Sequence, residues 1–231
     1  MAAPLRVLTT LGLQKVIEGA VAQLEAAAGR PLELSFGPTQ VQLQRLAEGA
    51  EADVVIVTEA GIASLAGQGK VDAATRTDFA RSAVGLAVKA GAPRPDIATV
   101  EALVATLRAV PSIVYSRQGA SGIFFAGLIE RLGIADAVNA KATIIPQGFT
   151  AAVVAKGEAV LAVQQLSELM AVDGVDIVGP LPDAVQEKLV FTGAVMTGSD
   201  APQAGRALLA ALAAACTPDR LAACGLRPVA G

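Results

Sequence analysis

The sequence predicts an α/β protein in which two doubly wound domains are joined by two crossing strands. Strand-like and helix-like segments alternate along most of the chain, as in parallel sheets covered by helices. The segment ADVVIVT (52–58) is apolar almost throughout, which is typical of a strand buried on both faces. Two long apolar segments, 82–90 and 188–198, separate two such α/β units, and each is long enough to cross between them.

The first unit begins with clear alternation. Strands are expected at 5–10 (LRVLTT), 32–37 (LELSFG) and 52–58. One helix is expected from residue 13 to residue 28, where Gly29 follows, and a shorter one at 40–48. Gly29 favours a helix end because glycine readily adopts the left-handed conformation that terminates many helices.

The second unit repeats the pattern. Its helices are expected at 101–108, at 122–132 and in AVVAKGEA (152–159). Strands are expected at 82–90, 112–115, 141–145 and 160–166, in VDIVGPLP, and at 188–198. An Ala-rich helix at 201–216 closes the chain.

This order of segments predicts a discontinuous first domain. Residues 1–83 plus 194–231 are expected to form domain 1, and residues 84–193 domain 2. Ligands of open α/β sheets bind outside the carboxyl ends of the strands. If two such sheets face each other, the ligand is expected in a cleft between the domains.

Composition excludes several classes of function. The 231 residues carry a net charge of -3 and no run of Lys and Arg, which argues against nucleic acid or an anionic membrane as partner. There is no histidine and there are only two cysteines, so neither a metal site nor a cofactor is expected. Cys216 and Cys224 are expected to be free thiols, or a disulfide if the chain is exported.

The compartment stays open at this point. No segment has the roughly 18 to 20 unbroken apolar residues of a membrane span. The segment from Met1 to Leu5 lacks the basic and apolar parts of a secretory signal. The protein is therefore expected in the cytoplasm, or in the periplasm if a signal has been removed from this sequence.

Small polar residues gather in four turns, each at the expected carboxyl end of a strand. Their hydroxyls, amides and helix N-termini suit an anion that needs several hydrogen-bond donors. Each turn alone could be an ordinary helix N-cap, but four at one sheet edge predict an anion site. The candidate ligands in these turns are Thr9, Thr10, Thr39, Gln40, Gly119, Ser121, Gly122, Gln164, Gln165 and Ser167.

Arg117 adds a charged donor to the third turn. Its planar guanidinium matches the geometry of a carboxylate, which it can bind through two parallel hydrogen bonds. The alternative is a surface ion pair with Glu130 or Asp136.

The chain carries, in order, VLTTLG, SFGPTQ, EADVVIVTEAG, GLAVKAGAPRPDI, YSRQGASG and VAKGEAVLAVQQLSEL. This series resembles the molybdate-binding-protein-like branch of the type II periplasmic binding proteins, over about residues 5 to 227. The resemblance implies an oxyanion held at turns that match Thr9 or Thr10, Thr39, and 119–122.

The chain departs from molybdate binders in three ways. Their serine-rich second turn is GPTQ here, and Pro38 removes one backbone N–H donor. The tyrosine that commonly closes on molybdate is missing, because Tyr115 is the only tyrosine. An arginine in the cleft is also unlike a molybdate site, so tetrahedral oxyanions are expected to bind more weakly than organic carboxylates.

These departures resemble a neighbouring group that includes aconitate isomerase. That resemblance implies a double-bond shift, which needs cations or amides on the substrate carboxylates and one base near the carbon. Arg117, Arg81 and the turn hydroxyls could hold the carboxylates. Glu168, Glu59 and Lys156 are the candidate bases, and Glu168 could equally be a solvated helix residue.

Two functional hypotheses follow. The first is a monomeric solute-binding protein that delivers a small anion, either an organic di- or tricarboxylate or an oxyanion, to an ABC-type permease. The second is an isomerase of a small unsaturated tricarboxylic acid on the same fold. A nicotinamide-dependent dehydrogenase is excluded, because TTLGLQKV stands where a G-x-G-x-x-G motif would follow the first strand.

Overall fold

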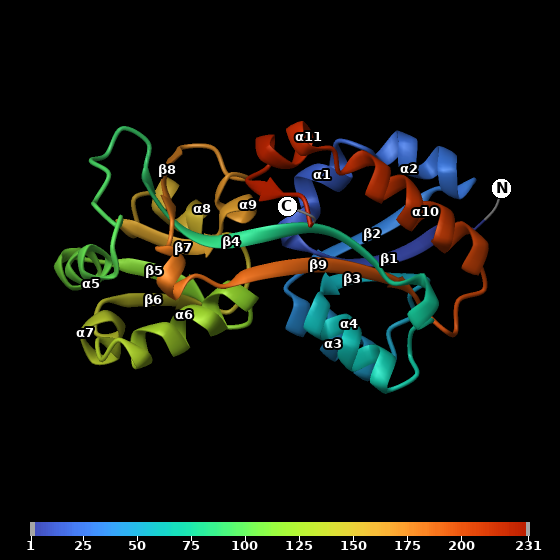
Figure 1. Ribbon diagram of the computed structural model, residues 1–231, viewed down its shortest axis with the longest axis horizontal. Coiled ribbons are helices and arrows are strands. Elements are labelled where there is room, and N and C mark those ends of the chain that lie inside the picture. Colours follow the sequence, from blue (N-terminus) through green and yellow to red (C-terminus); the bar gives the residue numbers. More distant parts are fainter. Residues whose placement is uncertain (1–2, 230–231) are drawn as a thin grey trace. The chain divides into compact units, whose positions relative to one another are not determined.

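The computed structural model describes residues 3–229, apart from the side chain of residue 188 (Figure 1). The chain divides into two compact units. Unit 1 contains residues 1–81 and 189–231, and unit 2 contains residues 82–188. The chain passes from one unit to the other within strands β4 (Thr77–Lys89) and β9 (Lys188–Val195).

Unit 1 is built on a mainly parallel sheet in the order β2-β1-β3-β9. Strand β1 (Leu5–Thr10) pairs in parallel with β2 (Leu32–Gly37) and with β3 (Val54–Thr58). Strand β9 runs antiparallel to β3, and the short β10 (Leu226–Arg227) pairs with β4. The carboxyl ends of the three parallel strands therefore meet at one edge.

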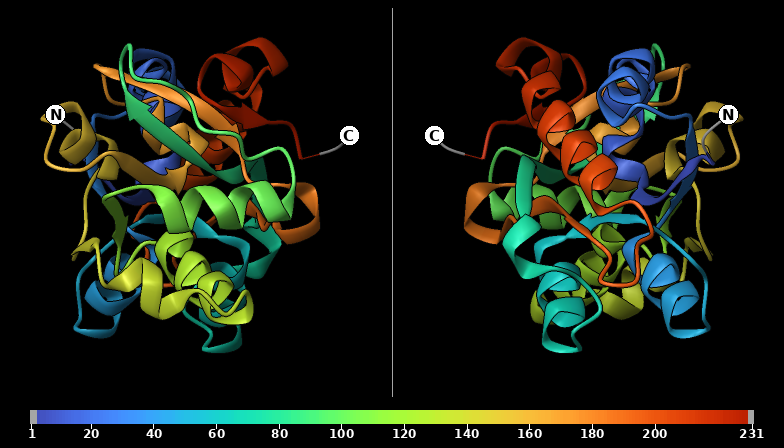
Figure 2. Two further views of the ribbon diagram at one scale, coloured as in Figure 1. Left: turned by 90° about the vertical axis from the view of Figure 1, so that its left-hand side faces the viewer. Right: turned by 90° about the vertical axis from the view of Figure 1, so that its right-hand side faces the viewer.

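Helices cover both faces of this sheet (Figure 1). One face carries α1 (Gln14–Glu18), α2 (Val21–Ala28) and α10 (Pro202–Ala215). The other carries α3 (Thr39–Ala47) and α4 (Glu59–Gly67), which Figure 2, right, shows below α10 and α2. Helix α11 (Pro218–Ala223) and the 3-10 turns Leu11–Leu13 and Ala73–Thr75 complete unit 1.

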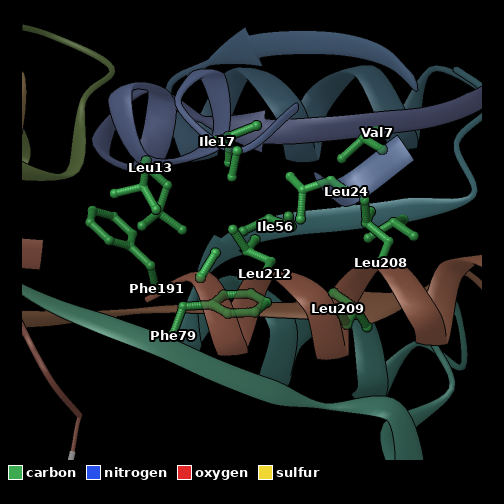
Figure 3. Packing of buried hydrophobic residues seen from close by; sticks show 14 of the residues in the cluster. Val7, Leu13, Ile17, Leu24, Ile56, Phe79, Phe191, Leu208, Leu209 and Leu212 are labelled. Carbon is green, nitrogen blue, oxygen red and sulfur yellow. The ribbon is translucent and has the colours of Figure 1, made fainter. Parts of the chain in front are cut away.

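The core on the α10 face combines two long helices with two aromatic rings from strands. Leu13 and Ile17 lie near Phe191, while Phe79 lies beneath Leu212 (Figure 3). A Cβ atom on Gly12 would come within 2.2 Å of the Phe191 ring, so the ring packs directly on the backbone that leaves β1.

The helix expected at 13–28 is broken in the structure. Helix α1 ends at Glu18, where the Gly19 amide donates to the Lys15 carbonyl, and α2 begins again at Val21. Glycine costs about 1 kcal/mol in a helix interior relative to alanine, so the break falls where helix is least stable. It leaves Ile17 and Leu24 buried in the same core.

Unit 2 has its own sheet, in the order β4-β7-β5-β6. Strand β5 (Ile113–Ser116) is parallel to β7 (Leu161–Gln165) and to β6 (Ala142–Ile145). Strands β7 and β8 (Val175–Pro180) both pair antiparallel to β4. The carboxyl ends of β5, β6 and β7 thus lie at one edge of the sheet.

Helices also cover both faces of this second sheet. Helices α5 (Val100–Ala109), α6 (Ala120–Arg131) and α7 (Ala135–Asn139) pack on one face, as Figure 2, left, shows in green and yellow-green. Helices α8 (Thr150–Ala155) and α9 (Leu166–Leu169) pack on the other, and a 3-10 turn spans Asp183–Val185. No helix among residues 3–229 is long and apolar enough to cross a membrane.

The predicted α/β class is confirmed, and the differences are local. Strand β4 begins at Thr77, five residues before the predicted strand. Helix α8 ends before Gly157, which has a φ of +80°, so the predicted helix 152–159 extends too far. Helices α4, α7 and α9 were not predicted, because each is short or has weak helical periodicity. Cys216 and Cys224 are free thiols, and burial raises the pKa of Cys216 to about 11.

Candidate functional site

The turn between β5 and α6 in unit 2 is closely packed. A Cβ atom on Gly122 would lie 1.7 Å from the Ser116 carbonyl oxygen, and one on Gly119 would lie 2.4 Å from Ser116 Oγ. Gly119 is the extended N-cap residue of α6. At Gly122 only glycine lets the helix begin directly over the end of the strand, because the atom that a side chain would meet belongs to the backbone.

The backbone of this turn is fixed while its hydroxyls are not bonded. The amides of Arg117 and Gln118 donate to the carbonyls of Ile145 and Pro146, at 2.8 Å and 3.3 Å. Ser116 Oγ and Ser121 Oγ are buried and have no hydrogen-bond partner within the protein. The start of α6 therefore presents two free hydroxyls next to a helix N-terminus, which is an arrangement that favours anions.

Gln164 and Gln165, at the end of β7, play different parts. The Gln164 amide is bonded within unit 2: its Oε1 accepts from Thr150 N at 2.8 Å and from Thr150 Oγ1 at 2.9 Å, and its Nε2 donates to the Gly148 carbonyl at 2.9 Å. The Gln165 side chain is equally buried, yet neither Oε1 nor Nε2 has a partner. Gln164 thus fixes the start of α8, whereas Gln165 is available to a ligand.

Glu168 is a buried carboxyl group one residue beyond Ser167. It is the third residue of α9, and its carboxyl accepts hydrogen bonds from the Gln165 backbone amide and the Gln164 side chain. Burial raises the pKa of Glu168 to about 7 in spite of these bonds, which favour the ionised form. The alternative of a solvated helix residue is therefore wrong, since the side chain is 8% exposed.

Ser167 lies opposite Ser82 of β4. The two hydroxyl oxygens are 3.5 Å apart and both side chains are buried. Ser82 therefore joins the polar group at this edge of unit 2.

Unit 1 carries a second polar group at the carboxyl ends of its parallel strands. Thr9 Oγ1 is buried without a partner, while Thr10 Oγ1 accepts from the Gly12 amide at 3.3 Å. Thr39 Oγ1 accepts from the Thr58 amide at 3.4 Å. Gln42 Nε2 donates to the Thr9 carbonyl at 3.1 Å, which fixes the strand end that carries the free hydroxyl.

Several other predicted residues are placed differently. Gln40 is exposed, and Glu59 is exposed and paired with Arg76 at 2.6 Å. Lys156 is exposed and directly follows the last residue of α8. It therefore lies at the opposite end of this helix from Thr150, which is the residue that contacts Gln164. Arg81 is half-buried on β4, within unit 1.

Arg117 is exposed at the turn before α6. Among the ion pairs of the described residues, none joins Arg117 to Glu130 or Asp136. The alternative role of Arg117, a surface ion pair with Glu130 or Asp136, is therefore not found among the described residues.

Four residues of these groups were missed by sequence reasoning. Gln42 and Thr58 lie in unit 1, and Ser82 and Thr150 lie in unit 2. Ser82 gave a weak signal, because it is a polar residue at the start of an apolar strand. Thr150 gave another, because it follows Gly148 at a turn between a strand and a helix.

Comparisons with known proteins cover nearly the whole chain. A family model described as bacterial extracellular solute-binding protein matches residues 5–227. An aconitate isomerase from a Pseudomonas species is 37% identical over 231 residues, which cover 97% of this chain and 88% of that protein.

Two solved structures show the same fold at low sequence identity. The periplasmic molybdate-binding protein of Azotobacter vinelandii has a TM-score of 0.75 and 17% identity, covering 96% of this chain and 98% of that one. A sulfate-binding protein of Mycobacterium tuberculosis has a TM-score of 0.75 and 21% identity, covering 99% of this chain and 88% of that one. The predicted resemblance to type II periplasmic binding proteins is thereby confirmed.

Proposed function

The chain belongs to the family of bacterial extracellular solute-binding proteins, and we propose that it binds a small organic anion with two or three carboxylates. One observation carries the proposal. Five buried polar atoms have no hydrogen-bond partner among the described residues, four of them in unit 2 and one, Thr9 Oγ1, in unit 1, and each lies at the carboxyl end of a strand or at the start of the helix that follows. An unsatisfied buried polar group costs about 1–3 kcal/mol, which a bound anion would offset. These atoms are Thr9 Oγ1, Ser116 Oγ, Ser121 Oγ, Gln165 Nε2 and Gln165 Oε1.

Organic carboxylates suit these surroundings better than tetrahedral oxyanions. Pro38 withholds a backbone donor from the turn before α3. Arg117 stands at the turn before the helix that carries Ser121 and makes no ion pair with the described residues, and a guanidinium binds a carboxylate in a planar two-bond contact. Calorimetric titration with molybdate, tungstate, citrate and both aconitate isomers tests this preference, and sub-micromolar molybdate binding would contradict it.

We further propose that the protein isomerises an unsaturated tricarboxylic acid, as the aconitate isomerase relative is named for doing. A shift of the double bond breaks a C–H bond next to a carboxylate. The released electron pair forms the new C=C bond, and the electrons of the old one take up a proton at the far carbon. One group that removes and returns the proton completes the reaction, without oxidant or reductant.

Glu168 is the group that we assign to this proton transfer. A carboxyl group with a pKa of about 7 is present in both protonation states near neutral pH, which suits it to remove a proton and to return it. Glu168 is also within the polar group of unit 2, since it bonds Gln165 N–H. Glu59 is held by Arg76, and Lys156 lies at the other end of α8.

The test is to incubate the protein separately with cis- and trans-aconitate and follow both by proton NMR. We expect both reactions to reach the same mixture. Glu168→Gln should lower kcat by about 10²- to 10⁴-fold, the usual contribution of acid–base catalysis, with KM changed little. Glu130→Gln, an exposed carboxylate on α6, is the matched control.

Together with the calorimetric titrations, the NMR experiment distinguishes an isomerase from a protein that only binds carboxylates. If citrate or aconitate binds but neither isomer is converted, the isomerase proposal is wrong. The protein would then be a periplasmic carrier that delivers a carboxylate to an ABC-type permease.

A further inference from the structure

Gln165 has a side-chain amide with nothing to bond to. Its backbone N–H is bonded by the Glu168 carboxyl, and in the β4–β7 register the residue lies opposite Val84. The residue is 2% exposed, and neither amide atom has a hydrogen-bond partner among residues 3–229. Alternation along a strand places it on the opposite face from Gln164, the face of Leu161 and Val163 on which α6 packs.

The adjacent Gln164 shows that this sheet edge can satisfy a buried glutamine. Three hydrogen bonds to Thr150 and Gly148 and one to the Glu168 carboxyl satisfy the Gln164 amide within unit 2. The free amide of Gln165 is therefore a feature of that one position.

An amide places a requirement on its ligand that a hydroxyl does not. The NH₂ group only donates and the carbonyl oxygen only accepts, whereas Ser116 and Ser121 hydroxyls can do either. A fully ionised carboxylate or sulfate only accepts, so it can bond Nε2 but leaves Oε1 unsatisfied. Exchanging the amide N and O by a flip leaves the same two requirements.

We infer that Gln165 selects anions that carry an O–H donor beside an oxygen acceptor. This inference rests on the proposed function and specifies its substrate class. Two chemical groups meet the requirement: a hydroxyl next to a carboxylate, or a carboxyl group bound in its protonated form. The amide binds either one through two hydrogen bonds, with Nε2 donating to the acceptor oxygen and Oε1 accepting from the O–H.

The experiment compares matched ligands by calorimetry at pH 8. Citrate and tricarballylate share three carboxylates and differ by one hydroxyl. If the hydroxyl is the donor, citrate should bind roughly tenfold to hundredfold more tightly, the range expected for one buried acceptor left unpaired. If a protonated carboxyl is the donor, the two ligands should bind with similar affinity and each should take up one proton on binding, measured from heats in two buffers.

Two variants show whether Gln165 is responsible. Gln165→Met keeps the length and removes both hydrogen-bonding groups, so the preference for citrate or the proton uptake should disappear. Gln68→Met, at the exposed end of α4, should leave it unchanged. Equal affinities without proton uptake in the wild type, or a preference or proton uptake that survives in Gln165→Met, would overturn the inference.

A second pair of ligands needs no variant and separates this inference from the proposed function. Sulfate and phosphate have the same tetrahedral shape, but only monohydrogen phosphate carries a proton to donate. If phosphate binds at least tenfold more tightly than sulfate while no tricarboxylate binds, the proposed function fails and the inference stands. If tricarboxylates bind with equal affinity and without proton uptake, and phosphate and sulfate also bind equally, the proposed function stands and the inference fails.

Discussion

Glu168 links stability to pH at the scale of a single residue. Its pKa is raised from 4.5 to about 7 by burial. Below pH 4.5 the group is protonated in both the folded and the unfolded states, so its contribution is fully present. Between pH 4.5 and 7 only the unfolded state ionises, so the free energy of unfolding falls as pH rises, and the loss is complete above pH 7.

We expect this loss to reach about 3 kcal/mol, because each pKa unit corresponds to about 1.4 kcal/mol. Glu168→Gln cannot ionise, so the stability difference between wild type and variant should shift by that amount from pH 4.5 to 8. Urea unfolding followed by far-UV circular dichroism at four pH values measures it. Parallel stability profiles of the two proteins would show that Glu168 ionises normally.

Arg117 is the charged residue that we expect to contact a substrate carboxylate. A charge-assisted contact contributes about 1.5–3 kcal/mol, so Arg117→Ala should weaken citrate binding by roughly tenfold to a hundredfold. Its exposure predicts an unchanged free energy of unfolding. The control is Arg108→Ala on α5, and calorimetry is the measurement. Unchanged affinity in Arg117→Ala would exclude the proposed contact.

At the residue scale, the sequence predicted which residues belong to the polar groups better than it predicted what each of them does there. It grouped Gln164 with Gln165, because both are amides at the end of one strand. Their difference depends on which face each occupies and on whether Thr150 lies opposite, which needs the packed structure. The burial of Glu168 was equally out of reach, since α9 has only four residues and too little periodicity to assign a face.

The start of α6 depends on glycine at the scale of one element. Gly122→Ala would press a methyl group against the Ser116 carbonyl, a backbone atom that cannot turn aside. We expect it to lower the free energy of unfolding by about 1–3 kcal/mol, as overpacking does, and to weaken citrate binding.

Gly127 in the same helix is the matched control. A methyl group there would meet only Arg131 Nη1, at 3.4 Å, the end of a flexible side chain. Gly127→Ala should therefore be neutral or stabilise by up to about 1 kcal/mol, because alanine favours helix. Urea unfolding measures the stability of both variants, and calorimetry measures their affinity for citrate. If the two substitutions changed stability and affinity equally, the steric argument would be refuted.

Elements with strong patterns were predicted closely, and weak ones were not. The strand at 5–10 matches β1, and the strand at 32–37 matches β2, because apolar positions and flanking turns agree. The break at Gly19 was missed, because the apolar spacing of 13–28 suits one continuous helix. The early start of β4 was missed because Thr77 and Asp78 are polar; Asp78 accepts from Thr192 Oγ1 at 2.7 Å.

At the scale of the whole molecule, the two units keep separate interiors. Each hydrophobic core cluster of the described residues is formed by one unit only. The clusters of unit 1 contain residues between Leu5 and Leu226 but none from 82–188, and the clusters of unit 2 contain residues between Val84 and Leu181. The alternation of strands and helices predicted the α/β class. The predicted location of the ligand in a cleft between the domains stays a prediction.

Separate cores imply that unit 2 can fold without unit 1. A fragment of residues 82–188 has the size of an ordinary domain and keeps both of its core clusters. Its two ends belong to β4 and β9, which are neighbours in the sheet, so the fragment begins and ends in adjacent strands. We expect the fragment to be helical by circular dichroism and to unfold cooperatively in urea. A fragment of residues 100–206 has the same length but loses β4 and should remain unfolded. If both fragments lack a cooperative transition, the interior of unit 2 depends on unit 1 after all.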